Sequence, residues 1–292
     1  VQILSSNLVS NGDFSQEGSE LVTGTNSDMS GANSWVGGIG SLDFNINTTV
    51  PNKMWCNFTS GNQQVKLDNV ITANKTYLVS LSARLNSGTA TTVQIGNFSS
   101  SQSDAGILNI TPTATTTTYS GYIVSGANVN LSIGIITANN NGSDYEFDNI
   151  SVKEVGQDWT LGSGWSIGED KAISDGSGFG ALSSSYSNFN SKKLKVNFDI
   201  LNYVSGEIRV PPSYRQDGLD IRYSANGSYE LIYDSINSAF ALNTVNFNGS
   251  ITNISVIEIT NDTNLPRINY EGFSYDANGD IIPNSGCGNW LL

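Results

Sequence analysis

Apolar and polar residues alternate over much of this chain. The stretch TYLVSLSAR (residues 76–84) places Tyr77, Val79 and Leu81 on one side, and KLKVNFDIL (193–201) and VNLSIGII (129–136) follow the same rule. A period of two sends successive side chains to opposite faces of a β-strand, whereas a helix repeats about every 3.6 residues. The pattern therefore predicts strands with one buried face, and it contains no amphipathic helix of useful length.

Turn-forming dipeptides separate these stretches. Asn-Gly pairs, in which both residues tolerate the positive φ of a tight hairpin turn, are spread over the whole chain. They begin at Asn11, Asn141, Asn226, Asn248 and Asn278. Short strands with frequent turns predict an all-β fold of the β-sandwich type.

One strand-like phrase occurs twice. FDNISVKEV (147–155) and ITNISVIEI (251–259) have the same residue at five of nine positions. Before each of them the same order recurs: a strand, a turn, a second strand and a gap. We therefore expect two related sandwich domains. The expected division is 1–155 for the first domain, 156–260 for a second, smaller domain and 261–292 for a C-terminal linking segment.

The repeated phrases carry two further expectations. Glu154 and Glu258 stand where the alternation would place a core residue, so we expect each strand to end or bulge there. The opening segment NLVSNGDF (7–14) has no clear counterpart in the second half, which is one reason to expect a smaller second domain.

The composition of the chain excludes several classes of function. Only 13% of the 292 residues are charged, against about a quarter in typical globular proteins. The net charge of −13 repels phosphate and anionic lipid, so we expect no nucleic-acid partner and no binding to an anionic membrane surface. The absence of His from the sequence removes Ser-His and Cys-His nucleophile systems and His-bearing zinc sites. No segment approaches the roughly 18 apolar residues of a membrane span, so membrane insertion is not expected.

The two cysteines and the first ten residues indicate the cellular compartment in which the chain folds. Cys56 and Cys287 are far apart, and we expect two free thiols, as in a chain folded in a reducing cytoplasm. A single long-range disulfide is the alternative. VQILSSNLVS has neither the basic start nor the long apolar run of a signal peptide. Because the chain does not begin with Met, we expect a processed form or a part of a longer protein.

Several motifs together resemble a known family. NLVSNGDF and FDNISVKEV, at the two ends of the first half, are similar to carbohydrate-binding-module jelly rolls of the family 4/9 type, especially those of bacteriophage tail and fibre proteins. GSGWSIGEDKAISDGSG, KLKVNFDILNYVSGEIRV and FNGSITNISVIEI resemble a second module common in those phage proteins. LPRINYEGF…GCGNWLL resembles a linking segment that follows such modules.

The resemblance implies an architecture and a setting. The fold would be two tandem jelly-roll-like β-sandwich domains followed by the linking segment. The protein would be a virion appendage, folded in the host cytoplasm, that forms a homotrimer, contacts other virion proteins and touches host-surface polysaccharide.

The resemblance also implies a structural calcium ion that ties the N-terminal segment to the last strand. Asp13 and Asp148 are the matching oxygen donors, helped by backbone carbonyls, and calcium accepts such hard oxygen ligands. Ser15 departs from the family, in which an acidic residue often follows the Phe. Thr252 replaces Asp148 in the second half, so the site is expected in the first domain alone. The alternative is that Asp13 caps a turn and Asp148 faces solvent.

A second calcium-like stretch, DANGD from Asp276 to Asp280, has its Gly at loop position four and Cys287 at position twelve. A calcium loop needs the Gly at position six and a Glu at position twelve. We therefore expect a polar turn there.

Aromatic residues are the candidates for glycan contacts, because exposed Trp and Tyr rings stack on the faces of sugars. Trp35 and Trp55 lie in the irregular 15–60 region, where a binding loop would lie. The alternative for each Trp is a place in the core, which the strand-like Gly-Trp-Ser-Ile context favours for Trp165. The candidates in the second half are Trp159, Tyr203 and Tyr214, with Trp165 and Tyr186 in addition.

Hydrolysis of a glycan would need paired carboxylates. Asp217 with Asp220, and Asp144 with Glu146, are available, but both pairs are expected in solvated turns without a pocket. We therefore expect no enzyme. The function that fits best is a tail or head fibre or decoration protein that recognises host glycan. The alternatives are a secreted bacterial glycan-binding module of a larger protein, a structural spacer without a ligand, and an endo-acting glycosidase.

Overall fold

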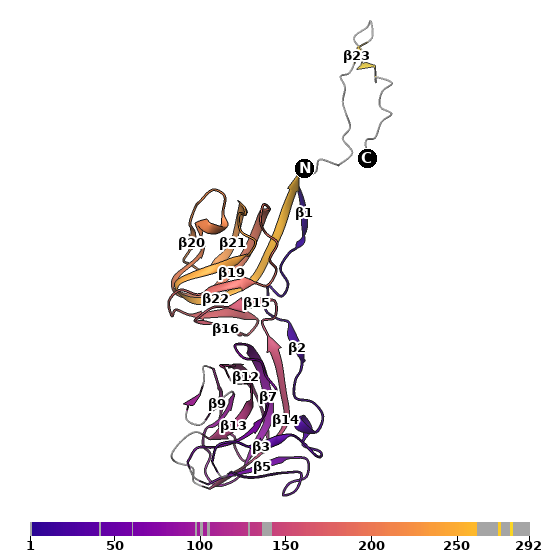
Figure 1. Ribbon diagram of the computed structural model, residues 1–292, viewed down its shortest axis with the longest axis vertical. Helices are drawn as coiled ribbons and strands as arrows, with labels where there is room; N and C mark the ends of the chain where they lie inside the picture. Colours follow the sequence, from indigo (N-terminus) through magenta and orange to yellow (C-terminus); the bar gives the residue numbers. More distant parts are fainter. Residues whose placement is uncertain are drawn as a thin grey trace.

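Two β-sandwiches lie one above the other in the computed structural model of the protein (Figure 1). The structure describes residues 2–40, 42–59, 61–96, 98–99, 102–103, 106–127, 129–135, 142–261, 274–275 and 281–282. Helical elements in these ranges are short: α1 (Thr25–Asp28) and a 3-10 turn, η1 (Pro212–Tyr214). The expected all-β, jelly-roll-like fold is confirmed. Within the described ranges, no helix is long and apolar enough to cross a membrane.

The first sandwich consists of two antiparallel sheets. One has the order β12-β7-β14-β5-β4, with β2 added beside β14, and the other has the order β11-β8-β13-β6-β3. Alternate residues of each strand point into one shared core, as Tyr77, Val79 and Leu81 do on β7. The strands are β2 (Glu17–Glu20), β3 (Trp35–Gly37), β4 (Asp43–Ile46), β5 (Met54–Phe58), β6 (Gln63–Leu67), β7 (Thr76–Ser87), β8 (Val93–Gly96), β11 (Leu108–Ile110), β12 (Thr117–Val124), β13 (Leu131–Ile135) and β14 (Ser143–Val155), with a separate pair, β9 (Phe98–Ser99) and β10 (Gln102–Ser103).

One continuous sheet of nine strands forms the second sandwich. Its two longest strands, β19 (Lys193–Val210) and β22 (Ala241–Asn261), pair over most of their length and carry the sheet around the core. At their bend Gly206 has a φ of 75°, and a Cβ there would lie 2.1 Å from the Asn246 carbonyl oxygen. Glycine is therefore required at this position. The other strands are β1 (Gln2–Asn7), β15 (Trp159–Leu161), β16 (Trp165–Gly168), β17 (Lys171–Asp175), β18 (Ala181–Ser184), β20 (Ile221–Tyr223) and β21 (Gly227–Asp234).

The structure tests one expectation about a turn and one about the cysteines. Asn248 and Gly249 lie inside β22 and not in a hairpin turn. Cys56 is a fully buried free thiol on β5, where burial raises its pKa. Of the linking segment, the structure describes the antiparallel pair β23 (Ser274–Tyr275) and β24 (Ile281–Ile282). Cys287 and the turn expected at 276–280 lie outside the described residues.

The N-terminal strand belongs to the second sandwich. β1 pairs with the end of β22, from Gln2 opposite Asn261 to Asn7 opposite Ile257, and Figure 1 shows the two strands side by side. Val9 and Phe14 are buried in the second core. The first 14 residues thus lie apart from the first domain in which we expected them. The first sandwich is inserted between β1 and the rest of the second, a pairing that spans the whole chain and that no local pattern indicates.

Both sandwiches begin with the same motif. In the second, the Asn7 side-chain oxygen accepts hydrogen bonds from Val9 N (3.3 Å) and Val256 N (2.8 Å). In the first, Glu20 Oε1 accepts them from Val22 N (3.1 Å) and Val152 N (2.7 Å). The counterpart of Asn7-Leu8-Val9 is therefore Glu20-Leu21-Val22.

Phe14 and Met29 match as well, since each is a buried residue with a φ near 56°, at 58° and 54°. NLVSNGDF itself belongs to the second sandwich, and its counterpart lies in the first sandwich and differs in sequence, so the lack of a counterpart in the second half is no reason to expect a smaller second domain.

The two half-buried glutamates of the repeated phrase have equivalent partners. Glu154 forms an ion pair with Lys75 (3.0 Å), just before β7, and Glu258 forms one with Lys192, just before β19. β14 and β22 continue past both glutamates, but the register with β2 and β1 shifts at these positions. The expected irregularity is thus present, on the edge-strand side only.

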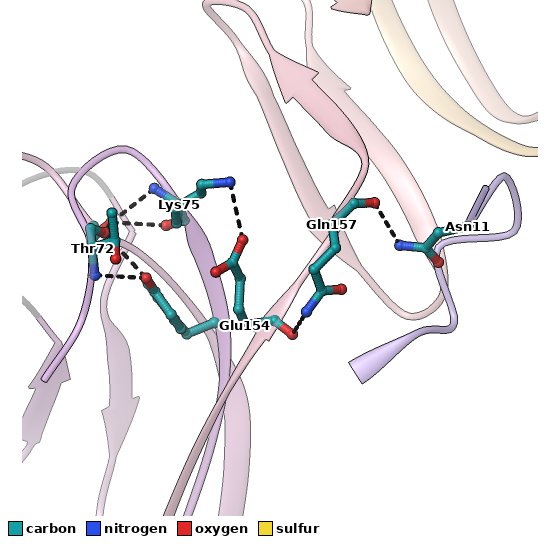
Figure 2. A network of polar contacts seen from close by, with 7 residues as sticks. Asn11, Thr72, Lys75, Glu154 and Gln157 are labelled. Atoms are coloured by element: carbon teal, nitrogen blue, oxygen red, sulfur yellow. Dashed lines mark hydrogen bonds and ion pairs between the residues drawn. The ribbon is translucent and has the colours of Figure 1, made fainter. Parts of the chain in front are cut away.

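Polar contacts tie the two crossing segments together between the sandwiches (Figure 2). Asn11 Nδ2 donates to the Gln157 carbonyl (3.0 Å), and Gln157 Nε2 donates to the Glu154 carbonyl (2.6 Å). Tyr122 of β12 and Leu78 of β7 pack against the second core. The connection is therefore a packed junction of two chain crossings and not a single linker.

A matched pair of truncations tests this topology. Phe14→Ala removes a ring from the second core, and Met29→Ala removes the equivalent side chain from the first. Each is expected to lower the free energy of unfolding by about 3 kcal/mol. In amide hydrogen exchange, Phe14→Ala should speed exchange on β19 and β22, and Met29→Ala on β7 and β14. If Phe14→Ala affected β7 and β14 alone, the assignment of the N-terminal segment to the second sandwich would be wrong.

Candidate functional site

The outward side of the sheet β12-β7-β14-β5-β4 carries charged and polar side chains from each of these strands. On β14, Tyr145 and Phe147 point into the core, so Asp144, Glu146 and Asp148 point outward. We call this outward side the polar face. Its residues are Asp43, Asn45, Lys53, Trp55, Asn57, Ser82, Arg84, Thr116, Thr118, Asp144, Glu146 and Asp148.

A hollow lies in the middle of the polar face. Lys53, Ser82, Arg84, Thr116, Glu146 and Asp148 line it. Asp148 forms an ion pair with Lys53, and its Oδ1 accepts a hydrogen bond from Asn149 N (2.7 Å). Asn149 has a φ of 50°, and the register with β7 shifts between Asp148 and Ser151. This bulge keeps the Asp148 carboxylate on the outward side while Ile150 returns to the core.

Glu146 is the unusual residue of the hollow. Only 7% of it is exposed, yet its carboxylate forms no hydrogen bond or ion pair with any described residue. Arg84 is its register neighbour on β7, and Arg84 Nε is buried without a hydrogen-bond partner among the described residues. Buried polar groups are almost always paired, because an unpaired one costs about 1–3 kcal/mol. The hollow is therefore lined by an acceptor without a partner among the described residues and by an Arg side chain whose Nε is left unpaired.

Trp55 lies beside this hollow. Its register neighbours are Glu146 on β14 and Asn45 on β4, and its side chain is half-buried. A half-exposed Trp next to paired and unpaired polar groups offers an apolar ring face within a polar surface.

The second sandwich shows what this fold needs at the same positions. The repeated phrase is aligned by its register with the neighbouring strands, and four polar-face residues have counterparts. These are Ser250 for Glu146, Thr252 for Asp148, Leu201 for Arg84 and Ile173 for Trp55. The same architecture thus forms with small or apolar residues there, so the charged groups and the Trp are not requirements of the fold.

The equivalent face of the second sandwich is also partly covered. Gly168 points outward beside Ile173, and a Cβ at Gly168 would lie 3.2 Å from Ile173 Cδ1 and 3.6 Å from Tyr122 Cδ2 of the first sandwich. Tyr122 thus rests on the face that corresponds to the polar face. The junction therefore leaves only the first of the two equivalent faces open at this position.

Trp35 and Trp159 are structural, contrary to the glycan-contact hypothesis. They are 5% and 4% exposed, and each indole N–H donates to a backbone carbonyl, of α1 for Trp35 and of the N-terminal segment for Trp159. Trp35 Nε1 donates to Asn26 O (2.9 Å), and Trp159 Nε1 donates to Asn11 O (3.0 Å). They occupy equivalent places in the two sandwiches and fill the ends of the two cores.

The other aromatic candidates are dispersed over the second sandwich. Tyr203 donates to Gly206 O (3.1 Å) at the strand bend, and Tyr214 lies in η1. Trp165 is buried, and Tyr186 packs edge-on against Phe189. None of these lies on the polar face, so the structure brings Trp55 alone of the aromatic candidates to the hollow.

The proposed calcium donors do not come together. The Asp13 carboxylate accepts hydrogen bonds from Ser15 in the N-terminal segment, beside the second sandwich, whereas Asp148 is already paired with the Lys53 ammonium. A calcium ion at Asp148 would have to displace this cation. The described part of the chain contains no group of three or more Asp, Glu, Cys or His side chains that could hold a metal ion. These residues do not fit the expected calcium site.

Of the two carboxylate pairs considered for hydrolysis, Asp217 lies in an exposed turn as expected, and the other pair is placed differently. Asp144 and Glu146 lie within β14 and not in a turn. Asp217 is held by Arg215, and this ion pair lowers the pKa of the Asp217 carboxyl. Sequence reasoning missed Lys53, Arg84 and Glu146 as site residues. Alternation along 143–148 was the available signal for Glu146, but recognising its neighbours required the strand register.

Because Glu146 has no partner within the described chain, the stability of a Glu146 variant shows whether this residue has a binding role or a structural role. Glu146→Gln removes a buried, unpaired charge and is expected to raise the free energy of unfolding by about 1 kcal/mol. Glu20→Gln, in the same sandwich, is the matched control and is expected to lower it by about 1 kcal/mol, because the Glu20 carboxylate accepts the Val152 and Ser151 hydrogen bonds. Chemical denaturation measures both. A loss of stability for Glu146→Gln as large as for the control would assign Glu146 a structural role.

Comparison with known proteins gives low similarities. No family model and no curated protein sequence matches the chain. Among solved structures, the tandem CBM22-1-CBM22-2 domain of Paenibacillus barcinonensis Xyn10C is 11% identical, with a TM-score of 0.40 over 84% of this chain and 98% of that one. The N-terminal cellulose-binding domain of Cellulomonas fimi β-1,4-glucanase C is 13% identical, with a TM-score of 0.29 over 46% and 92%. An allantoicase is 12% identical, with a TM-score of 0.27 over 86% and 93%. Similarities at this level do not identify a family or a ligand.

Proposed function

We propose that this protein is a non-enzymatic glycan-binding protein and that it binds sugar on the polar face of its first sandwich. The observation that supports this proposal is the hollow beside Trp55, with its unpaired Glu146 and Arg84, at positions where the second sandwich has Ser250 and Leu201. Groups that the fold does not need, and that are not satisfied within the protein, are explained by a ligand.

The chemistry of the face fits a polyhydroxylated ligand. A sugar hydroxyl both donates and accepts, so neighbouring hydroxyls can donate to the Glu146 carboxylate and accept from the Arg84 guanidinium. The ring of Trp55 can stack on the apolar face of the same or the next sugar. The hollow is open and shallow, so a single sugar would keep much of its contact with water. Binding at one face is therefore expected to be weak.

Weak sites become effective when several act together. If protomers associate through a symmetric contact, their faces act on one glycan surface and affinity rises by multivalency. A homotrimer in a bacteriophage appendage would supply this arrangement, and the motif resemblance in residues 157–260 and 265–292 is what suggests it. A secreted bacterial glycan-binding module of a larger protein would use the same face. Electron microscopy that places the chain on a particle would separate the two settings.

Removal of the Trp55 ring tests the proposed face. Trp55→Ala is expected to reduce binding to a retained glycan at least tenfold, since base or sugar stacking on an aromatic ring contributes a substantial part of such contacts. Affinity electrophoresis against a panel of soluble polysaccharides measures this. Phe179→Ala is the control, because Phe179 is 76% exposed on the second sandwich, away from the face.

Two results would contradict the proposal. If Trp55→Ala and Phe179→Ala bind alike, the face is wrong. If the folded wild-type chain binds no glycan at high density on an array, the function is that of a spacer without a ligand. We expect no release of reducing sugar from any bound polysaccharide.

A further inference from the structure

Among the described residues, the polar face has more unpaired hydrogen-bond acceptors than unpaired donors. If the proposed function holds, this excess of acceptors indicates which kind of sugar binds there. Glu146 has a free carboxylate, and Asp144 Oδ1 and Asn57 Oδ1 are buried without hydrogen-bond partners among the described residues. Asp43 is exposed at the same edge and forms no ion pair within the described chain. Arg84 Nε is the unpaired donor, because Lys53 is engaged by Asp148.

These acceptors gather around one ring. Asn57 has Asp43 and Asp144 as its register neighbours, and Trp55 precedes it by two residues on the same side of β5. We call Asp43, Trp55, Asn57, Asp144 and Glu146 the acidic corner. Directly opposed and diagonal side chains on one sheet face lie within about 5–8 Å of each other, so the carboxylates of Asp43, Asp144 and Glu146 act together on a charge held above Trp55.

The net charge of the polar face, like its unpaired acceptors, favours a ligand that carries positive charge. Its acids are Asp43, Asp144, Glu146 and Asp148, and its bases are Lys53 and Arg84, which leaves 2 − 4 = −2. Neutral hydroxyls can satisfy hydrogen bonds there but do not compensate this charge. A carboxylated sugar would meet repulsion both from the corner and from a chain of net charge −13.

We propose that the polar face selects glycans with free amino groups and that the sugar ammonium binds at the acidic corner over Trp55. An ammonium carries three N–H donors and one positive charge, which matches unpaired acceptors beside carboxylates. A Trp face attracts a cation in addition. The hollow next to the corner, with Arg84 and the Lys53–Asp148 pair, takes the neutral hydroxyls of the adjoining sugar.

Two ligands that differ only in acetylation test the selection. Oligosaccharides of glucosamine and of N-acetylglucosamine, equal in length, are titrated by calorimetry into the full chain in mildly acidic buffer, so that the free amine is protonated. The free-amine ligand is expected to bind at least tenfold tighter at low salt. Its advantage should shrink toward physiological ionic strength, since exposed charges are then screened. A neutral glucan oligosaccharide and an oligogalacturonate complete the set, and the acidic ligand is expected to bind weakest.

Charge-neutralising variants locate the amine. Asp43→Asn and Asp144→Asn should each reduce the preference for the free amine severalfold and leave binding of the acetylated ligand nearly unchanged. Glu169→Gln is the control of equal charge change, since the Glu169 side chain is 82% exposed on the second sandwich. The inference would be overturned by equal or tighter binding of the acetylated ligand, or by a preference that persists in both corner variants. If no ligand of the set binds and Trp55→Ala changes nothing on the glycan array, the proposed function itself fails.

Discussion

The pairing of each closing strand with its neighbours on both sides determines the rest of this molecule. β14 lies between β7 on one side and β5 and β2 on the other, and β22 lies between β19 on one side and β17 and β1 on the other. A strand with neighbours on both sides has its backbone hydrogen bonds satisfied along its length, so its register is strongly specified. The register decides which side chains enter the core and which face outward, and it thereby decides where a site can exist.

A β-bulge at the same position of β14 and β22 determines which side chains of each strand face inward. Asn149 and Asn253 have φ values of 50° and 55°, and the register with the long neighbouring strand shifts around each. The extra residue lets Asp148 face outward before the bulge while Ile150 and Val152 face inward after it. Asn tolerates this left-handed conformation better than most residues, because its short side chain hydrogen-bonds locally. The change from the outward Asp148 to the inward Ile150 thus depends on an Asn in the repeated phrase.

Comparison of equivalent positions in the two sandwiches separates features that the fold requires from features that it does not require. Where they agree, as in the Glu154–Lys75 and Glu258–Lys192 pairs, the shared feature is explained by the fold. Where they differ, as at Glu146 and Ser250, the fold accepts either residue, and a difference that leaves a buried carboxylate unpaired calls for another cause. This reasoning separates Trp35 and Trp159, which match and are buried, from Trp55, whose counterpart is Ile173.

Sequence and structure agree where the physics is local. Alternation along 77–83 and 194–200 is a property of single strands, and the structure places these side chains in the cores. The assignment of Val9 and Phe14 was different in kind, because it depends on β1 reaching across the inserted sandwich to β22, and no property of residues 2–14 indicates that partner. Trp burial was equally hidden, since Trp35 and Trp55 both lie in the stretch that the sequence marks as irregular, yet Trp35 is buried and Trp55 is only half-buried.

The site needed the same nonlocal information. Asp144, Glu146 and Asp148 could be placed on one side of a strand by counting, but Arg84, Lys53 and Asn57 come from strands up to some 90 residues away. A buried, unpaired carboxylate is an unfavourable feature in a stable scaffold, and its cost is removed when a ligand supplies the missing donor. The groups that weaken the isolated first sandwich are therefore the ones that a bound sugar would stabilise, and a bound ligand should raise the free energy of unfolding of this sandwich.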